Sequence, residues 1–274
     1  MIPLVVLDID GTLIGSSKRV EPCVWEAADR ARKAGVRLAV STGRPGFGVA
    51  REVAERLDPT APHIFQNGAH ATFLNGSTVH VSGLREKNAM KLVEMAREWG
   101  TPLELYTPDA LYVERKTEVS EAHAKMLGTK SLVRDLAEVV ESEPVIRAQW
   151  LATNEDLPVL EANTLPGTTM NWAVSPALSG VYFVSVTREG TDKGTALEKL
   201  ASSLGASLQD VMVVGDSPGD LPMLERVGHP RVMASGDEGM VATYAAERGV
   251  PGVDECGAAV AIDQAVELKP VVQP

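Results

Sequence analysis

Four aspartates lie in two short stretches that also contain glycine and hydroxyl residues. Asp8 and Asp10 belong to the stretch DIDGT near the start of the chain, and Asp216 and Asp220 belong to GDSPGD much further along. Carboxylates at such close spacing repel one another and raise one another's pKa, and a divalent cation would relieve this repulsion. Because these stretches contain no histidine or cysteine, the pattern indicates a hard ion with oxygen ligands, and we expect Mg²⁺.

Hydrogen-bond donors suited to a phosphoryl group lie in two further stretches, STGR and DKG. The first comprises Ser41, Thr42, Gly43 and Arg44, and the second contains Lys193. A hydroxyl group, an ammonium group and backbone N–H groups made accessible by glycine all donate well to phosphoryl oxygens. For Arg44 two interpretations stay open: contact with a second anionic group of a substrate, or a salt bridge with a surface carboxylate.

Each of these stretches stands at the end of an expected strand or at the start of an expected helix. Short runs of branched apolar residues predict strands, and longer runs with apolar residues along one side predict helices. The expected strands are residues 4–8, 36–40, 63–66 and 211–214, and the expected helices are residues 21–35, 46–57, 193–204 and 221–227. Apolar strands that alternate with helices indicate a parallel sheet covered on both faces. We therefore predict an α/β fold with a doubly wound, Rossmann-like parallel sheet, whose ligand lies at the carboxyl ends of the strands.

The middle of the chain shows a different order of elements. Helices are expected at residues 86–99, 118–127, 135–140 and 155–162, and strands at residues 103–106, 111–114, 145–151, 168–174 and 181–186. This mixture predicts an α+β unit inserted into the first one. The predicted domains are a catalytic core of residues 1–83 and 188–274 and an inserted cap of residues 84–187.

Charge and composition restrict the possible partners and locations. The 274 residues carry a formal charge of −11 at pH 7, which disfavours nucleic acid or an anionic membrane as the main partner. No apolar run is long enough to cross a bilayer, and Asp8 interrupts the apolar run near the N-terminus, unlike in a signal peptide. Cys23 and Cys256 match no metal-binding spacing, so we expect two reduced thiols and a cytoplasmic location.

The motifs DIDGT, STGR, DKGTAL and GDSPGDLPML, in this order, resemble those of the haloacid dehalogenase superfamily of phosphatases. The resemblance covers the whole chain. The position and element order of the insert look like the type IIB cap of the Cof-like sugar-phosphate phosphatases. The resemblance implies a Mg²⁺-dependent phosphatase that hydrolyses a small phosphorylated metabolite, such as a sugar phosphate, through an aspartyl-phosphate intermediate.

The resemblance also implies a role for each residue of the motifs. Asp8 is the implied nucleophile, and Asp10 is the implied general acid and base. The implied metal site comprises Asp8, Asp10 through its backbone carbonyl, Asp216 and Asp220. The residues of STGR and Lys193 are the implied phosphoryl-binding groups, and Asp220 would also orient Lys193 or a metal-bound water.

Gly219 departs from the family pattern, which usually has asparagine at this position. Because Asp216 and Asp220 are retained, we expect metal binding to persist. Whether the missing amide loosens Lys193 or a metal-bound water and so lowers the rate stays open. A phosphomutase of the phosphomannomutase type stays open as an alternative, since it would use the same Asp8 and Asp10. A non-catalytic phosphate-binding protein also stays open, since it would account for Gly219.

A receiver domain likewise combines an acidic cluster with a lysine on a parallel sheet. It would have about half this length and would lack the inserted cap. We expect the chain to act as a monomer or a homodimer, with a small phosphorylated metabolite as its partner.

Overall fold

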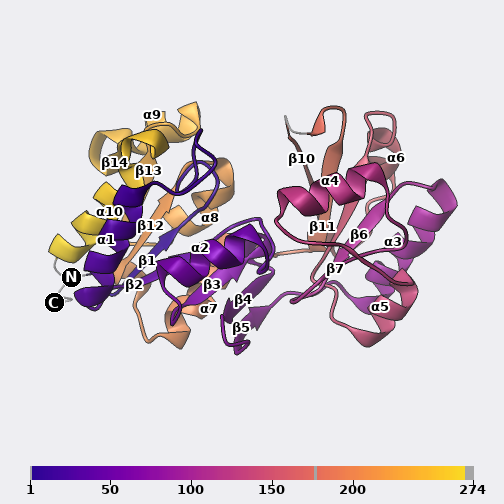
Figure 1. Ribbon diagram of the computed structural model, residues 1–274, viewed down its shortest axis with the longest axis horizontal. Coiled ribbons are helices and arrows are strands. Elements are labelled where there is room, and N and C mark those ends of the chain that lie inside the picture. The colour runs from indigo at the N-terminus through magenta and orange to yellow at the C-terminus, as the bar shows by residue number, and fades with distance from the viewer. Residues whose placement is uncertain (1, 176–177, 269–274) are drawn as a thin grey trace. The chain divides into compact units, whose positions relative to one another are not determined.

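The computed structural model describes residues 2–175 and 178–268 of the chain, which form two compact units. The first unit comprises the described residues of 1–44, 50–80 and 192–274, and the second comprises the described residues of 45–49 and 81–191 (Figure 1). The second unit thus includes a five-residue segment that directly follows STGR. Each unit is described separately below.

The first unit is built on a five-stranded parallel sheet, as the sequence predicted. Its strand order is β14–β13–β12–β1–β2. β1 pairs with β2 on one side and with β12 on the other, so the direction of strand succession reverses at β1, and ligands bind at such a switch point. The strands are β1 (Leu4–Leu7), β2 (Arg37–Val40), β12 (Val211–Gly215), β13 (His229–Met233) and β14 (Gly249–Val250).

Helices cover both faces of this sheet. α1 and α10 pack against each other, whereas α7 and α8 share a buried core with β1 and β12, in which Leu4, Val6 and Leu197 are inaccessible to solvent. Because Leu4 and Val6 point to one face of β1, Val5 and Leu7 point to the opposite face. The helices are α1 (Pro22–Lys33), α2 (Val49–Leu57), α7 (Lys193–Ser203), α8 (Leu221–Leu224), α9 (Glu238–Arg248) and α10 (Gly257–Glu267).

A small antiparallel sheet of β3 (Pro62–Phe65), β4 (His70–Phe73) and β5 (Thr78–Val81) continues from the parallel one. An isolated parallel bridge between Ser41 and Ile64 links them. The helix expected at residues 46–57 begins only at Val49, because Gly48 has a left-handed φ of 62°. The short 3-10 helices are η1 (Gln66–Gly68), η3 (Leu208–Asp210), η4 (Pro218–Asp220) and η5 (Val253–Glu255).

The second unit has a six-stranded sheet of order β10–β11–β9–β6–β7–β8, in which β7 and β8 are parallel and the other pairs antiparallel. Its core packs around Leu105, Val93 and Trp150. The strands are β6 (Leu103–Tyr106), β7 (Leu111–Val113), β8 (Leu132–Val133), β9 (Arg147–Ala152), β10 (Thr168–Val174) and β11 (Tyr182–Arg188). The helices are α3 (Glu86–Trp99), α4 (Glu118–Met126), α5 (Leu136–Ser142) and α6 (Leu157–Ala162).

The expectation of two reduced thiols is wrong, because Cys23 and Cys256 form a disulfide. Cys23 lies in the first turn of α1, and Cys256 directly precedes α10. Since these helices pack side by side, the two Cα atoms are 6.3 Å apart although the residues are 233 positions apart in sequence. Spacing along the chain therefore gave no indication of this bond.

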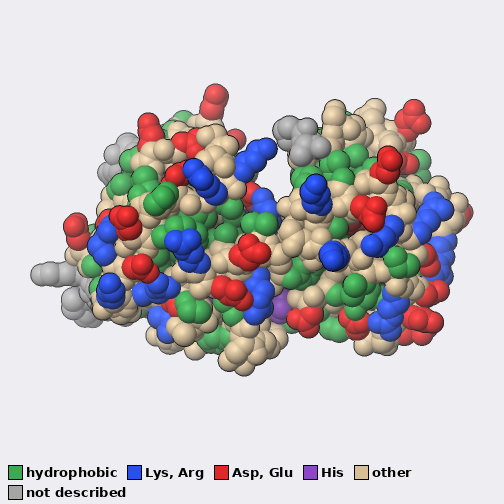
Figure 2. All heavy atoms as spheres, viewed as in Figure 1, with side chains coloured by type: hydrophobic (Ala, Val, Ile, Leu, Met, Phe, Trp, Pro, Cys, Tyr) green, Lys and Arg blue, Asp and Glu red, His purple; other side chains and the backbone are tan. Residues whose placement is uncertain are grey.

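Acidic and basic side chains are interspersed over the face of the molecule in Figure 2. Within residues 2–175 and 178–268, no helix is both long and apolar enough to cross a bilayer.

Candidate active site

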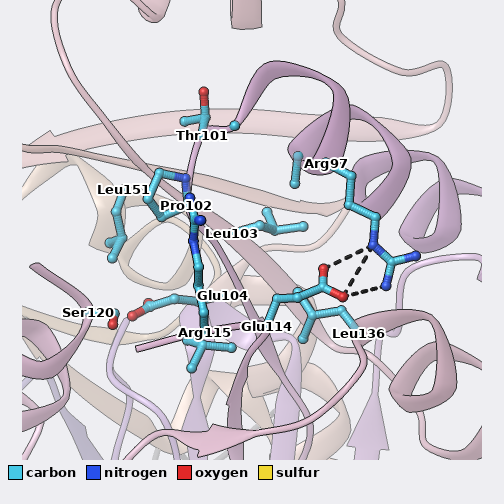
Figure 3. Close-up of a pocket in the computed structure, with 13 residues that line it drawn as sticks. Arg97, Thr101, Pro102, Leu103, Glu104, Glu114, Arg115, Ser120, Leu136 and Leu151 are labelled. Carbon is cyan, nitrogen blue, oxygen red and sulfur yellow. Dashed lines mark hydrogen bonds and ion pairs between the residues drawn. The ribbon is translucent and has the colours of Figure 1, made fainter. Parts of the chain in front are cut away.

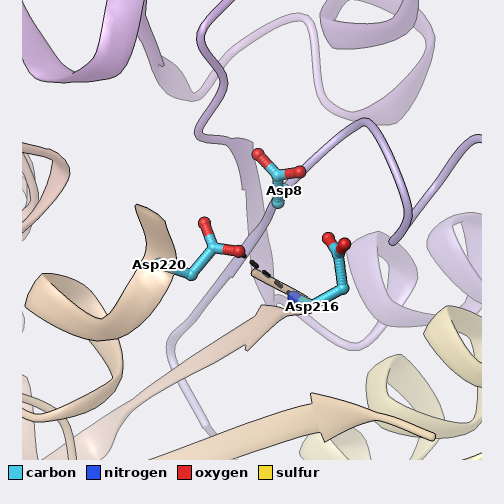
Figure 4. Close-up of side chains that lie close together, drawn as sticks. All are labelled: Asp8, Asp216 and Asp220. Carbon is cyan, nitrogen blue, oxygen red and sulfur yellow. Dashed lines mark hydrogen bonds between the residues drawn. The ribbon is translucent and has the colours of Figure 1, made fainter. Parts of the chain in front are cut away.

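Three aspartates of the first unit meet at the carboxyl edge of its parallel sheet (Figure 4). Asp8 follows β1, Asp216 follows β12, and Asp220 ends η4. β1 and β12 are paired up to their carboxyl ends, where the Asp8 N–H donates a hydrogen bond to the Val214 carbonyl oxygen at 3.0 Å. One carboxylate oxygen of each aspartate lies within 4.8 Å of the others, and such a set of oxygen ligands fits a hard divalent cation.

Lys193 is the first residue of α7, and its ammonium group lies between two of these carboxylates. Nζ donates to Asp8 Oδ1 at 2.6 Å and to Asp220 Oδ1 at 2.8 Å. The helix begins here because the Asp192 carboxylate accepts a hydrogen bond from the Thr195 N–H at 2.9 Å, which caps its first turn. The ion pair is buried, and its single cation faces three carboxylates, so negative charge is in excess.

Burial and, to a smaller extent, this excess charge raise the pKa values of two carboxyl groups. Burial raises the pKa of Asp8 to about 7, with Asp220 also raising it and Lys193 opposing the change. Burial and the charge of Asp220 raise the pKa of Asp216 to about 6, although the Thr12 hydroxyl, which donates to Asp216 Oδ1 at 3.0 Å, lowers it. A bound cation would favour the ionised form of both groups.

At two positions beside the carboxylates, glycine avoids a steric clash that any side chain would cause. A Cβ atom on Gly11 would lie 2.2 Å from Asp216 Oδ2, and one on Gly215 would lie 2.6 Å from the Asp220 Cβ. Gly11 also has a φ of 88°, which side-chain-bearing residues rarely adopt. Glycine at these two positions is therefore required for the carboxylates to approach one another.

The Asp10 side chain lies outside the cluster of three carboxylates and pairs with Arg44 instead. Arg44 donates from Nε to Asp10 Oδ2 at 2.7 Å and from Nη2 to Asp10 Oδ1 at 2.6 Å. Both carboxylate oxygens are thus occupied, and the hydrogen bond with Asp10 raises the pKa of Arg44. Of the two interpretations left open for Arg44, the structure shows a salt bridge, and its partner is a residue of the candidate site itself.

The remaining residues of STGR form a tight loop after β2. The Ser41 side chain is inaccessible to solvent, and its hydroxyl has no hydrogen-bond partner among the described residues. Thr42 Oγ1 accepts a hydrogen bond from the Arg44 N–H at 3.1 Å, which fixes the loop, and Gly43 faces the Asn67 side chain. A buried hydroxyl without a partner is unusual, and a ligand oxygen at this position would satisfy it.

Gly219 lies in η4 beside the acidic cluster. A Cβ atom there would meet only the Ser217 hydroxyl among the described residues, at an ordinary contact distance of 3.6 Å, so the surroundings tolerate a Cβ atom at this position. Asp220 is held without help from residue 219, because its Oδ2 accepts hydrogen bonds from the N–H groups of Asp216 at 3.1 Å and Ser217 at 3.2 Å.

Neither Thr12 nor Asn67 was assigned a role from the sequence. Thr12 is part of DIDGT, so its position in that motif was the available signal. For Asn67 the only signal was the Asn67-Gly68 pair, which is equally typical of an ordinary turn.

A cavity of about 460 Å³ lies within the second unit, lined by both apolar and charged side chains (Figure 3). Arg97 and Glu114 form an ion pair at its edge, and Glu104 is buried beside it. Glu104 Oε2 accepts hydrogen bonds from Tyr106 and Gln149, so this carboxylate serves the packing of the sheet. Among the described residues that line this cavity there is no lysine and no close group of carboxylates, in contrast to the edge of the parallel sheet.

Comparisons with known proteins identify the family of the chain. Residues 5–247 match the haloacid dehalogenase-like hydrolase family. The chain is 27% identical over 252 residues to the pyridoxal phosphate phosphatase YbhA of Escherichia coli, covering 87% of this chain and 90% of YbhA. It is 25% identical over 256 residues to the Bacillus subtilis protein YwtE, a 5-amino-6-(5-phospho-D-ribitylamino)uracil phosphatase, covering 82% and 85% of the two chains.

A solved structure of a haloacid dehalogenase-like hydrolase from Bacteroides thetaiotaomicron has a TM-score of 0.84 with this chain at 24% identity. The match covers 96% of this chain and 99% of that one, so the fold is shared throughout. The chain therefore belongs to the haloacid dehalogenase-like hydrolases, among the Cof-like phosphatases, and it is a phosphoric monoester hydrolase.

Proposed function

We propose that the chain is a Mg²⁺-dependent phosphatase of small phosphorylated metabolites that works through an aspartyl-phosphate on Asp8. The observation that carries this proposal is the meeting of Asp8, Asp216, Asp220 and Lys193 at the sheet edge. These residues combine a carboxylate nucleophile, a hard-ion site and a cation for a phosphoryl group. When bound there, Mg²⁺ would offset negative charge on the phosphoryl oxygens and on the carboxylates.

In the first step, an Asp8 carboxylate oxygen attacks phosphorus, and the bond between phosphorus and the leaving oxygen breaks. Asp10 in its protonated form gives its proton to that leaving oxygen, which departs as an alcohol. Lys193 holds Asp8 in place through its 2.6 Å hydrogen bond and contributes positive charge to the phosphoryl group.

In the second step, the Asp10 carboxylate takes a proton from water, and the water oxygen attacks phosphorus. The bond between phosphorus and Asp8 breaks, which releases orthophosphate and regenerates the Asp8 carboxylate. The bidentate salt bridge with Arg44 favours the ionised form of Asp10, so it must weaken before Asp10 can carry the proton needed in the first step, whereas the ionised form is the one needed in the second. The Ser41 hydroxyl and the other groups of STGR would bind phosphoryl oxygens.

Two relatives and the insert support the proposed substrate class. YbhA and YwtE carry the names of phosphatases of small phosphorylated molecules, and we propose a compound of this kind, a sugar phosphate in the first instance. We also propose that the core comprises residues 1–83 and 188–274, and that residues 84–187 act as a cap that recognises the leaving group. The charge of −11 supports a metabolite rather than nucleic acid or an anionic membrane as the partner.

The proposed location is the cytoplasm, and the proposed oligomeric state is a monomer or a homodimer. The disulfide weighs against a reducing compartment, since such bonds persist mainly in oxidising ones. Thiol labelling of the protein in intact cells tests the proposed location directly. In a reducing cytoplasm the disulfide should be reduced and Cys23 and Cys256 should react with the reagent, whereas an intact disulfide would leave both unlabelled and contradict this location.

Phosphate release from a panel of phosphorylated metabolites with Mg²⁺ tests the proposed activity. Asp8→Asn and a chelator should each abolish release, whereas Asp29→Asn should not, because Asp29 is exposed on α1 and its ion pair is with the nearby Arg32. Release that persists in Asp8→Asn contradicts the proposed nucleophile. Transfer of phosphate within a sugar phosphate, without net release, would instead favour the phosphomutase.

A further inference from the structure

The corner at Gln66, Asn67 and Gly68 has an uncommon backbone conformation. All three residues have positive φ, at 53°, 55° and 94°. Asparagine tolerates this region and glycine favours it, but glutamine rarely adopts it. Gln66 is also fully buried, and neither polar atom of its side-chain amide has a hydrogen-bond partner among the described residues. Such unfavourable features persist only where the surroundings hold them, and they are concentrated at functional sites.

Two motifs of the candidate site hold this corner from opposite sides. The Gln66 N–H donates to the Arg44 carbonyl oxygen at 3.0 Å, and the Asn67 N–H donates to the Thr42 carbonyl oxygen at 2.9 Å. On the other side, a Cβ atom on Gly68 would lie 2.1 Å from the Asp192 carbonyl oxygen. The corner therefore contacts both the STGR loop and the residue that precedes α7, the helix that begins with Lys193.

The conformation turns the Gln66 side chain inward and the Asn67 side chain outward to solvent. The Asn67 carboxamide lies against Gly43, where a Cβ atom would be 3.0 Å from Oδ1 and 3.3 Å from Nδ2. An exposed amide donor thus stands on the loop to which the proposed function assigns the phosphoryl oxygens. Its N–H groups add hydrogen-bonding capacity without adding charge.

We propose that Asn67 is a further substrate-binding residue, whose carboxamide donates a hydrogen bond to the phosphoryl group bound by the STGR loop. This inference rests on the proposed function, since it assumes that the loop binds phosphate. In the alternative account, asparagine stands at position 67 only because it tolerates the left-handed backbone conformation, and it does not contact the substrate. The two accounts differ in what replacement by another residue that accepts this conformation should do.

Asn67→Asp and Asn67→Gly separate them. Aspartate has the same shape and tolerates a positive φ, but it replaces the donor by a negative charge that repels phosphate. Glycine adopts the positive φ without strain and removes the side-chain hydrogen-bond donor. Asn75→Asp is the matched control, because Asn75 is an exposed residue in the turn between β4 and β5 and its replacement introduces the same charge.

For each protein we would measure the KM of the best substrate, the inhibition constant of orthophosphate and the thermal midpoint. Loss of one hydrogen bond to a charged ligand should raise KM and the orthophosphate constant about tenfold in Asn67→Gly, with the midpoint unchanged or higher. Asn67→Asp should raise both constants further, and Asn75→Asp should change neither. Calorimetric titration with orthophosphate gives the same comparison without turnover.

Variants at position 67 that match the wild type in both constants overturn the inference and leave Asn67 as a turn residue. If the wild type binds orthophosphate but hydrolyses no ester, and Asn67→Asp loses that binding, the inference stands while the proposed activity fails. A wild type that neither hydrolyses an ester nor binds orthophosphate overturns both.

Discussion

Replacing Asp8 by asparagine should stabilise the metal-free protein, and increasingly so as the pH rises. The pKa of Asp8 is raised from its ordinary value of 3.8 to about 7. Between these pH values the folded protein keeps a proton that the unfolded chain has lost, so the free energy of unfolding falls as the pH rises. Each pH unit corresponds to about 1.4 kcal/mol well below the folded-state pKa and to about half of that at the pKa itself, which amounts to about 2 kcal/mol between pH 5 and pH 7.

An asparagine side chain at position 8 cannot ionise, so the variant escapes this loss. The stability difference between variant and wild type should therefore grow by about 3 kcal/mol from pH 5 to pH 8 in favour of the variant. His63, whose pKa is lowered to about 4 by burial, titrates in both proteins and cancels in the difference. Asp216, whose pKa is raised to about 6, lies beside Asp8, so its titration is coupled to that of Asp8 and belongs to the same pH-dependent loss of stability. Lys193, whose pKa is raised by Asp8 and Asp220 against the effect of burial, stays charged throughout this range.

Thermal unfolding in the presence of a chelator at pH 5, 6, 7 and 8 measures this difference. For a chain of this size about 1 kcal/mol corresponds to roughly 2–4 °C in the midpoint. Adding Mg²⁺ at pH 8 should raise the midpoint of the wild type more than that of the variant. Parallel curves of midpoint against pH for the two proteins would refute the reasoning, because they would mean that the folded state does not shift the Asp8 pKa.

Four further changes test other parts of the site and fold. Lys193→Met removes the cation between two buried carboxylates and should cost about 3–5 kcal/mol at pH 8 in unfolding experiments, and less at pH 5, where Asp8 takes up a proton. Arg44→Lys should change stability by less than about 1 kcal/mol, because the Asp10 side chain is half exposed, but should weaken orthophosphate binding measured by calorimetry. Gly219→Asn introduces a Cβ atom that meets no contact closer than 3.6 Å and should raise kcat in a steady-state assay, and an unchanged kcat would show that this amide is not needed. Cys23→Ser should lower the free energy of unfolding by up to about 5 kcal/mol through loss of a long-range cross-link, and a midpoint equal to that of the wild type under non-reducing conditions would contradict the disulfide.

The sequence was sufficient to predict that Asp8 and Asp216 lie close together. Each follows a continuous apolar run, such runs form neighbouring parallel strands, and the carboxyl ends of these strands share one edge. Lys193 could be placed near them for a similar reason, because it begins a helix after an aspartate that caps it. These inferences depend only on local patterns and on general rules of parallel sheets.

Other features depend on contacts that local patterns do not encode. The salt bridge between Arg44 and Asp10 requires the conformations of two separate loops, and the left-handed backbone of Gln66 opposes its own preference. The disulfide between Cys23 and Cys256 depends on the packing of the first helix against the last. In each case tertiary contacts, rather than residue type or spacing, decide the outcome.

The most direct test of the central claim is to trap the phosphorylated intermediate. Wild-type protein would be quenched with acid during turnover of its best substrate with Mg²⁺, treated with borohydride, and analysed by peptide mass spectrometry. Because borohydride reduces an acyl phosphate to an alcohol, the account predicts homoserine at position 8 and at no other aspartate. Steady turnover with an unmodified Asp8, or with the reduced residue at another position, would contradict it.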